Sequence, residues 1–176
     1  QPKGVASCKH DFAEPDNARN NLKSLPYVEG VASIRGSMTW FGNREVTDEG
    51  GKVLFTPRCA AFDKDFVPLL GLHIKTGRNF TGERQFLVNQ PYVEKMGWKG
   101  SGVGEIVPNR GTVVGVLAPF CCGVLPADNE PLEIEYGTNL RNVHVRLKEP
   151  FTVNLHRLNN EMKKIYPQED IEFRSL

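Results

Sequence analysis

The sequence predicts an α+β fold, in which both ends of the chain form one split β-α-β/β-α-β sandwich lobe around an inserted β-rich mixed lobe. Each end reads strand, helix, strand. The middle is rich in Gly and Pro, and its apolar residues occur in short runs typical of strands. The 176 residues, 39% of them hydrophobic, suffice for one compact domain or two small lobes.

Residues 1–38 are expected to form the first half of the sandwich. An apolar segment over residues 5–12 predicts a strand, and Pro15 suits the first turn of a helix that Pro26 ends. The side chains that would face the core recur at helical spacing: Ala18, Leu22 and Leu25. A second strand over residues 31–38 completes a β-α-β unit long enough for a helical crossover.

Residues 39–140 are expected to form the inserted lobe, built mainly from short strands. Four apolar runs predict these strands: Val53–Thr56, Phe86–Asn89, Thr112–Leu117 and Leu132–Tyr136. A short helix that reaches Leu70 follows Asp63 and Asp65. We expect both carboxylates to cap this helix, since negative charge is favourable at a helix N-terminus.

Residues 141–176 are expected to form the second half of the sandwich. Apolar and polar residues alternate over residues 143–148, which predicts a half-buried strand. Thr152 is the expected N-cap of the next helix, and the Tyr166-Pro167 pair ends it. Its core-facing residues recur at helical spacing: Leu155, Leu158, Met162 and Ile165. A last strand around Ile171 and Phe173 would bring residues 1 and 176 close together.

Charge and hydropathy exclude several classes of partner. The net charge is +1, from 22 basic and 21 acidic residues, and there is no run of Lys and Arg. Neither nucleic acid nor an anionic membrane surface is therefore expected as the main partner. The longest apolar run, residues 112–126, contains Pro119 and is too short to span a bilayer. The start at Gln1, without Met or a signal-peptide pattern, is typical of a mature or trimmed product.

No pattern in the sequence predicts an active site, and we expect no catalytic, cofactor-binding or metal-binding residue. The glycine-rich stretch 100–104 lacks the Lys-Ser/Thr of a phosphate-binding loop and is interpreted as a turn. No serine lies in a nucleophile elbow, and no histidine lies in a triad context. Cys8 and His10 have no second cluster at ligand spacing, so a small hydrolase or metal enzyme is the weakest alternative.

The four cysteines are Cys8, Cys59, Cys121 and Cys122, a density too low for a disulfide scaffold. Buried or free thiols are the preferred interpretation, because Cys behaves as a small hydrophobic residue. One structural disulfide is the alternative. The sequence does not determine their redox state.

Six short fragments occur in a characteristic order between Leu70 and Val116. They are a helix ending in Leu-Gly, a Gly-Arg-x-Phe turn, a strand ending in Asn, a helix closing in Gly, a Gly-x-x-Ile turn and a Val-x-Gly-Val strand. The residues that carry the pattern are Gly71, Gly77, Arg78, Phe80, Asn89, Gly97, Gly104 and Gly115. This order resembles the MacB-like periplasmic core domain of ABC transporter permeases of the FtsX-like family, and the flanking segments extend the resemblance over nearly the whole chain.

The resemblance implies a split porter lobe at residues 1–38 and 141–176 and an inserted Sabre lobe at residues 39–140. It also implies a non-catalytic domain on the periplasmic or extracytoplasmic face of the bacterial inner membrane. This domain would relay ATP-driven motion to export, lipoprotein handling or an extracytoplasmic partner. The implied partners are flanking transmembrane helices, a cytoplasmic ATPase that uses the ATP, a second permease copy, and an adaptor or lipoprotein. The alternative is a free-standing secreted or periplasmic module that binds a ligand or peptide in a cleft.

Two features of the inserted lobe have both a structural and a functional interpretation. Arg78 lies in the Gly-Arg-x-Phe turn, where its guanidinium is expected to tie backbone carbonyls or a carboxylate together. Trp40 and Phe41 stand where the first half gives way to the insertion. They are either an exposed aromatic surface for a partner or part of the core between the lobes, and core packing is the preferred interpretation.

Overall fold

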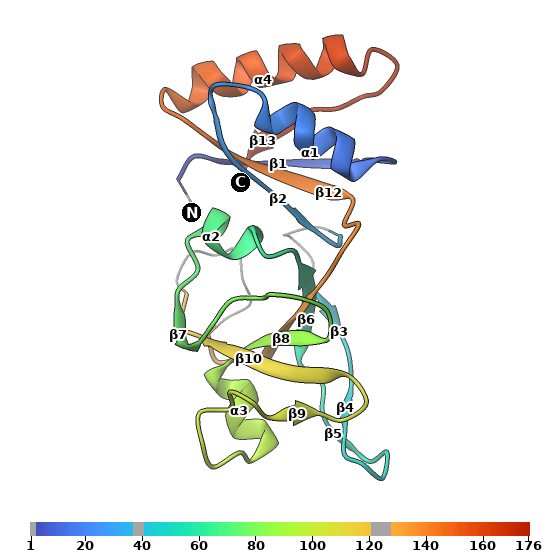
Figure 1. The fold of residues 1–176 in the computed structure, drawn as a ribbon, viewed down its shortest axis with the longest axis vertical. Helices are drawn as coiled ribbons and strands as arrows, with labels where there is room; N and C mark the ends of the chain where they lie inside the picture. The colour runs from blue at the N-terminus through green and yellow to red at the C-terminus, as the bar shows by residue number, and fades with distance from the viewer. Residues whose placement is uncertain (1–2, 37–40, 121–127) are drawn as a thin grey trace.

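The computed structural model describes residues 3–36, 41–120 and 128–176, which form an elongated molecule with helices at both ends (Figure 1). The first elements in chain order are β1 (Val5–Asp11), α1 (Pro15–Lys23), β2 (Val28–Ile34), β3 (Gly42–Asn43), β4 (Val46–Thr47), β5 (Val53–Phe55), β6 (Arg58–Phe62), α2 (Phe66–Leu70) and β7 (Ile74–Gly77). They are followed by β8 (Gln85–Asn89), α3 (Gln90–Met96), β9 (Ile106–Val107), β10 (Gly111–Leu117), β11 (Leu132–Tyr136), β12 (Asn142–Leu147), α4 (Phe151–Ile165) and β13 (Phe173–Ser175).

One mixed sheet runs along the molecule in the strand order β13-β1-β12-β2-β6-β11-β8-β10-β7. We call its first four strands the terminal half and its last five the central half. In the terminal half, β1 pairs antiparallel with both β12 and β13, and the Leu176 amide donates to the Val5 carbonyl at 3.0 Å. The two chain ends therefore build one unit, which confirms the predicted fold class. Residue 1 lies outside the described residues.

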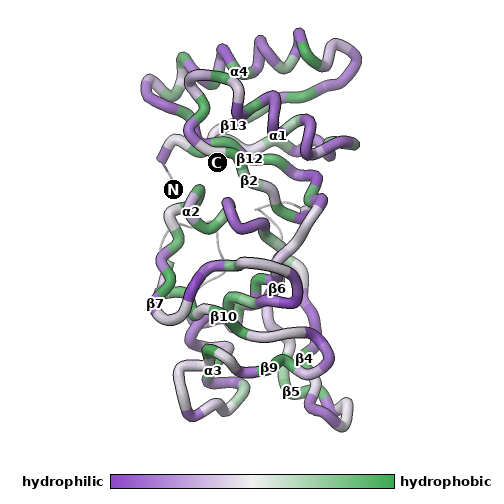
Figure 2. Tube along the Cα trace, in the orientation of Figure 1, coloured by the Kyte–Doolittle hydropathy of each residue, from purple (hydrophilic) through white to green (hydrophobic). Residues whose placement is uncertain are grey.

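Helices α1 and α4 both cover the same face of the terminal half (Figure 1). Their apolar stripes turn toward the strands: Ala18, Leu22, Leu158 and Met162 are almost fully buried. Along α4 the tube in Figure 2 alternates between hydrophilic and hydrophobic, as an amphipathic helix should. None of the described helices is both long and apolar enough to cross a bilayer.

The predicted N-cap of α4 is wrong by two residues. The helix begins at Phe151, and Pro150, with extended backbone, precedes it. The Phe151 amide donates to the Glu149 carboxylate at 2.9 Å, so Glu149 caps the first turn in place of Thr152. Thr152 is exposed within the first turn.

The second strand starts three residues earlier than predicted, because α1 ends early. Its C-cap is Ser24, whose hydroxyl donates to the Asn21 carbonyl at 2.6 Å. The chain turns at once and pairs from Val28, opposite Leu147, to Ile34. Residues 37–38, the end of the predicted strand, lie outside the described residues.

The central half carries a separate layer on each face. One face packs with α2 in a cluster that includes Phe62, Leu87 and Ile134, and the other packs with α3 around Val88 and Tyr92. The strands predicted in this region are confirmed as β5, β8, β10 and β11. The lobe boundaries after residues 38 and 140 stay a prediction.

The edge strand β13 is covered by a side chain of α4. Asn159 accepts a hydrogen bond from the Phe173 amide at 2.8 Å and donates to the Phe173 carbonyl at 3.0 Å. Its amide group thus occupies both backbone groups that Phe173 would otherwise offer to another strand.

Two glycines allow β7 and β10 to approach each other closely. Gly77 has φ of 84°, and a Cβ there would lie 2.2 Å from the Val114 carbonyl oxygen. A Cβ on Gly115 would lie 2.6 Å from the Arg78 carbonyl oxygen. Real Cβ atoms do not come so close to backbone, so both positions of the recognised pattern require glycine for steric reasons.

We predict that Gly77→Ala lowers the free energy of unfolding by about 3 kcal/mol or more, because a left-handed conformation and a backbone clash both oppose a side chain. The measurement is urea denaturation monitored by circular dichroism. Gly82→Ala is the matched control, since Gly82 lies in open space without a positive φ. Equal stability of the two variants would contradict the steric role of Gly77.

Candidate functional site

The terminal and central halves of the sheet meet at a narrow junction between β2 and β6. Ile34 and Phe62 are the pair that joins the two strands. Two backbone hydrogen bonds flank it, from the Arg35 amide to the Ala61 carbonyl at 3.0 Å and from the Asp63 amide to the Ser33 carbonyl at 3.1 Å. Because this backbone pairing is so short, side-chain contacts must fix much of the relative orientation of the two halves.

An ion-pair cluster ties α1, from the terminal half, to the central half across this junction. The Arg19 guanidinium contacts the Asp63 carboxylate, Asp65 at 2.9 Å and the Ser33 hydroxyl at 3.1 Å. The Asp63 oxygen that contacts Arg19 also accepts a hydrogen bond from the Ser33 backbone amide at 2.8 Å. Burial raises the pKa of the Asp63 carboxyl, and the neighbouring Arg19 opposes that rise. We call Arg19, Ser33, Asp63 and Asp65 the junction cluster.

Asp63 also caps the N-terminus of helix α2, but the predicted cap by Asp65 needs correction. Its Oδ1 accepts hydrogen bonds from the Asp65 and Phe66 amides, each at 3.0 Å, so Asp63 caps the helix as predicted. Asp65 stands at the N-cap position but makes no side-chain cap. Its backbone is already helical, and its carboxylate points instead to Arg19.

Helix α2 fills the space between the junction and the terminal half. Phe66 packs at 4.5 Å from the Phe62 ring and edge-on, at 5.1 Å, against the His144 ring of β12. Leu69 reaches Gly30 of β2, where a Cβ would lie 3.2 Å from its Cδ1. Arg146 of β12 donates to the Leu69 carbonyl. The first turn of α2 thus contacts both halves of the sheet, and Leu69 in its last turn contacts the terminal half.

A second buried network, which the sequence analysis missed, stabilises the central half. Glu133 of β11 is 1% exposed and accepts from both terminal nitrogens of Arg110 and, at 2.9 Å, from the Tyr92 hydroxyl. Arg110 also lies over the Phe86 ring, 5.0 Å from its centroid. Burial and Glu133 raise the pKa of Tyr92, so it remains a hydrogen-bond donor. In the sequence, Glu133 and Glu135 alternate with apolar residues of this strand, and this pattern could have indicated a buried carboxylate.

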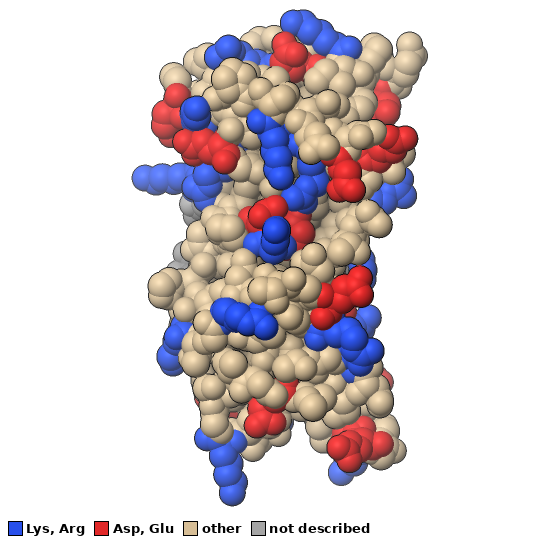
Figure 3. Space-filling model, viewed as in Figure 1, with Lys and Arg blue, Asp and Glu red and all other residues tan. Residues whose placement is uncertain are grey.

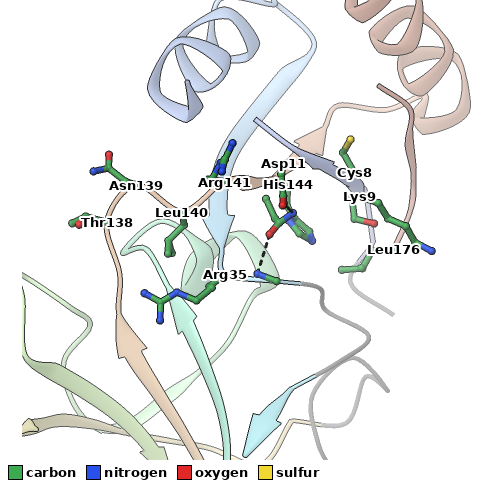
Figure 4. A pocket seen from close by; sticks show the side chains of 13 residues that line it. Cys8, Lys9, Asp11, Arg35, Thr138, Asn139, Leu140, Arg141, His144 and Leu176 are labelled. Carbon is green, nitrogen blue, oxygen red and sulfur yellow. Dashed lines mark hydrogen bonds between the residues drawn. The ribbon is translucent and has the colours of Figure 1, made fainter. Parts of the chain in front are cut away.

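His144 of β12 is a buried histidine whose pKa is shifted from its usual value. Burial lowers its pKa to about 4, and the nearby Asn142 backbone carbonyl opposes this shift more weakly. Neither ring nitrogen has a partner at good hydrogen-bond geometry. His144 is one of the residues that border a cavity of about 640 Å³ beside β1 and β12 (Figure 4).

The residues of the recognised pattern lie in caps, turns and the core rather than around one cavity. Gly71 and Gly97 end α2 and α3 in the left-handed conformation, and Gly104 also has a positive φ. Asn89 is the N-cap of α3, accepting from the Tyr92 amide at 3.2 Å, and it also accepts from the Leu132 amide at 2.9 Å. These contacts fix the start of α3 beside β11.

Arg78 and Phe80 have structural contacts as well. Arg78 donates to the Asn79 carbonyl at 3.0 Å and to the Thr81 hydroxyl at 3.1 Å, so it ties the turn together. Two kinds of partner were predicted for Arg78, backbone carbonyls or a carboxylate. The structure shows a backbone carbonyl. Phe80 is 4% exposed, and its ring packs in a tilted arrangement against Tyr136, with 5.7 Å between the ring centroids.

Phe41 is not an exposed aromatic surface. It is 5% exposed and belongs to the core cluster around α2. This corrects the partner-surface interpretation and agrees with core packing. Trp40 lies outside the described residues.

The described cysteines, Cys8 and Cys59, are free thiols, and burial raises the pKa of each. Both are therefore protonated and poorly reactive at neutral pH. Cys121 and Cys122 lie outside the described residues. The His10 imidazole pairs with the Glu169 carboxylate, whereas the His10 backbone amide donates to the Cys8 sulfur at 3.3 Å.

In the part of the chain that the structure describes, no group of three or more His, Cys, Asp and Glu side chains could hold a metal ion. Acidic and basic side chains are interspersed over the face shown in Figure 3, without a broad patch of one sign.

We predict that Arg110→Gln lowers the free energy of unfolding by about 3 kcal/mol or more, because it leaves the Glu133 carboxylate buried without its cation. Adding Glu133→Gln should recover part of this loss. Arg44→Gln removes an exposed pair with Glu135 at 3.3 Å and should cost less than about 1 kcal/mol. Chemical denaturation of the three variants measures these differences. A double variant no more stable than Arg110→Gln would contradict a coupled pair.

We predict that acid destabilises the protein through His144. The unfolded chain takes up this proton near pH 6.5 and the folded chain only near pH 4, so stability is lost as the pH falls between these values. The full difference corresponds to about 3 kcal/mol. Unfolding free energies from pH 4 to 7 should fall less steeply in His144→Gln than in the parent, whereas the exposed His156→Gln should keep the parent slope. Parallel slopes for all three proteins would refute the assignment.

The fold matches solved structures across the whole chain. The periplasmic region of MacB from Actinobacillus actinomycetemcomitans superposes with a TM-score of 0.71 at 13% identity, covering 99% of this chain and 89% of that one. The extracellular domain of the noncanonic ABC-type transporter YknZ from Gram-positive bacteria gives 0.62 at 16% identity, covering 97% and 100%. A domain of a putative permease protein from Porphyromonas gingivalis gives 0.62 at 15% identity, covering 98% and 90%.

Sequence comparison adds no family, because no family model and no curated protein matches the chain. The structural likeness extends over 99% of this chain and therefore over both halves of the sheet. The chain therefore has the MacB-like fold found in extracytoplasmic domains of ABC transporter permeases.

Proposed function

We propose that this chain is a non-catalytic extracytoplasmic domain of an ABC transporter permease, on the outer face of the bacterial inner membrane. The observation that carries the proposal is the likeness to the MacB periplasmic region over 99% of the chain, with a TM-score of 0.71. In this role the domain receives motion from flanking transmembrane helices. A separate cytoplasmic ATPase supplies the energy, so the domain itself needs no cofactor.

The sheet geometry suits such a relay. Strands β1 and β13 are hydrogen-bonded neighbours in the terminal half, so chain continuing from either end would leave from the same edge region. A displacement applied there reaches the central half through the β2–β6 pair, α2 and the junction cluster. Since Arg19 contacts two carboxylates across the junction, the two halves should move as one body.

The relayed motion would act on an exported molecule, a lipoprotein or an extracytoplasmic partner such as an adaptor. Two copies of the permease would move relative to each other. The sequence alternative, a free-standing module that binds a ligand or peptide, requires neither a second copy nor ATP, so ATP dependence distinguishes the two. A hydrolase or metal enzyme would instead require a reacting centre.

The test uses the full-length protein that contains this chain, reconstituted with its ATPase. Spin labels are introduced as unnatural amino acids at Lys95 in α3 and Lys164 in α4. We expect ATP to change the distance between Lys164 labels of two copies and to leave the Lys95–Lys164 distance within one copy unchanged. Identical spectra with and without ATP would reject the relay.

We predict that Arg19→Gln uncouples the halves, because it leaves the buried Asp63 carboxylate without its cation. The Lys95–Lys164 distance distribution should broaden while ATP hydrolysis continues. In the isolated chain, the Ser33 and Phe66 amides, which donate to Asp63, should exchange hydrogen faster. Lys23→Gln, one turn along the exposed side of α1, is the matched control. An unchanged distance distribution in Arg19→Gln would remove the junction cluster from the relay.

A further inference from the structure

Helix α2, which joins the two halves of the sheet, packs on a buried histidine. The Phe66 ring of α2 meets the His144 ring of β12 edge-on, with 5.1 Å between the ring centroids. His144 is 2% exposed, and Ser7 of β1 and Ala32 of β2 stand opposite it in the sheet. Burial penalises the charged form of a side chain, so the ring is neutral in this position.

The surroundings of His144 give a proton little support. Both ring nitrogens are buried, and the Asn142 backbone carbonyl is the group that favours the charged ring. Helix α2 carries no charged residue. The neighbouring strands and the segments beside them contribute these charged side chains: Lys9, Asp11, Arg35, Arg141 and Arg146. Burial and the Asn142 carbonyl, rather than these charges, determine the pKa of His144.

The adjacent cavity of about 640 Å³ provides room for the ring outside the core. His144 and Asp11 both border this cavity (Figure 4). Asp11 pairs with Asn142, two residues before His144, in the register of β1 and β12. Asp11 Oδ1 accepts a hydrogen bond from the Asn142 side chain at 2.5 Å, and Oδ2 has no hydrogen bond to a described residue. The cavity therefore offers a carboxylate oxygen that can accept from an imidazolium.

The positive side chains around the cavity do not occupy this carboxylate. Arg35 pairs with a carboxylate of β11 at 3.2 Å, and Arg141 donates to a backbone carbonyl after β1 at 3.0 Å. Lys9 is exposed, so its ammonium group can remain in water. A charged His144 ring would thus gain a counter-ion beside Asp11 that it lacks beside Phe66.

We propose that His144 is an acid-sensitive switch: protonation turns its ring from Phe66 into the cavity, where it pairs with Asp11, and the contact of α2 with β12 weakens. The change requires only a proton from the solvent. Because α2 joins the two halves of the sheet, acid would loosen their coupling. This consequence rests on the proposed relay, in which an extracytoplasmic domain meets the pH of the cell's surroundings.

Asp63, on the other side of α2, responds to acid in the opposite direction. Burial raises the pKa of its carboxyl, so proton uptake by Asp63 favours the closed junction. For His144 the sign is reversed. The closed position is fully favoured above about pH 6.5 and loses this advantage as the pH falls toward 4. An acid-induced release of α2 must therefore come from His144 rather than from Asp63.

The test is an NMR titration of the isotope-labelled chain from about pH 7 to about pH 3.5. We expect the His144 ring signals to titrate between pH 4 and 6.5. With the same midpoint, hydrogen-exchange protection of the Leu69, Gly71 and Leu72 amides, corrected for intrinsic exchange, should fall by about threefold or more. Protection of the Val113 amide in β10 should not change, because the release is local.

Variants separate the switch from general acid destabilisation. His144→Phe keeps an aromatic ring against Phe66 but takes up no proton, so α2 should stay protected throughout. Asp11→Asn, at an exposed residue, should lower the His144 midpoint by about half a pH unit or more. Asp16→Asn is the matched control, since Asp16 is exposed in the first turn of α1 and does not line the cavity.

Three results would each overturn the switch. They are a His144 ring that does not titrate before the whole chain unfolds, α2 amides that stay protected while it titrates, and equal midpoints in Asp11→Asn and Asp16→Asn. If His144→Phe does not fold, the titrations of the parent and of Asp11→Asn still decide. Failure of the relay would appear instead as ATP-independent distances in the full-length protein, which none of these measurements uses.

Discussion

The rest of the structure depends on how the sheet crosses from β2 to β6. Strand pairing there is limited to Ile34 and Phe62 with two flanking backbone hydrogen bonds, while β12 and β2 pair along their whole length. Helix α2 compensates by burying Phe66 and Leu69 against the terminal half. Arg19 adds charge-assisted hydrogen bonds, which are stronger than neutral ones where solvent is limited. The junction thus combines a minimal backbone connection with well-packed side chains.

The two buried carboxylates have different tasks in this arrangement. Glu133 lies inside the central half, where Arg110 and Tyr92 satisfy it, and it fixes α3 and β10 relative to β11. Asp63 lies between the halves and combines a helix cap with an ion pair. One network makes a half rigid and the other joins the halves. This division suits the relay proposed above.

Much of the fold could be predicted from local patterns, because alternation, helical spacing and proline positions act over a few residues. The glycine-rich fragments between Leu70 and Val116 were informative since their backbone geometry admits few other residues, as at Gly77 and Gly115. The roles of Arg19, Glu133 and His144 could not be predicted, because each depends on a partner, or on the lack of one, far away in sequence. Core packing of Phe41 was the preferred prediction, whereas the cap of α4 was missed because Glu149 makes it in place of Thr152.

The amide side chain of Asn159 has a consequence for how many copies of this domain can share a surface. An open sheet edge invites strands of neighbouring molecules, and growth by such addition leads to fibrous aggregates. By imitating a neighbouring strand at Phe173, Asn159 shortens the backbone available for such addition at the β13 edge. Neighbouring copies would then make contact through side chains, without joining their sheets at this edge.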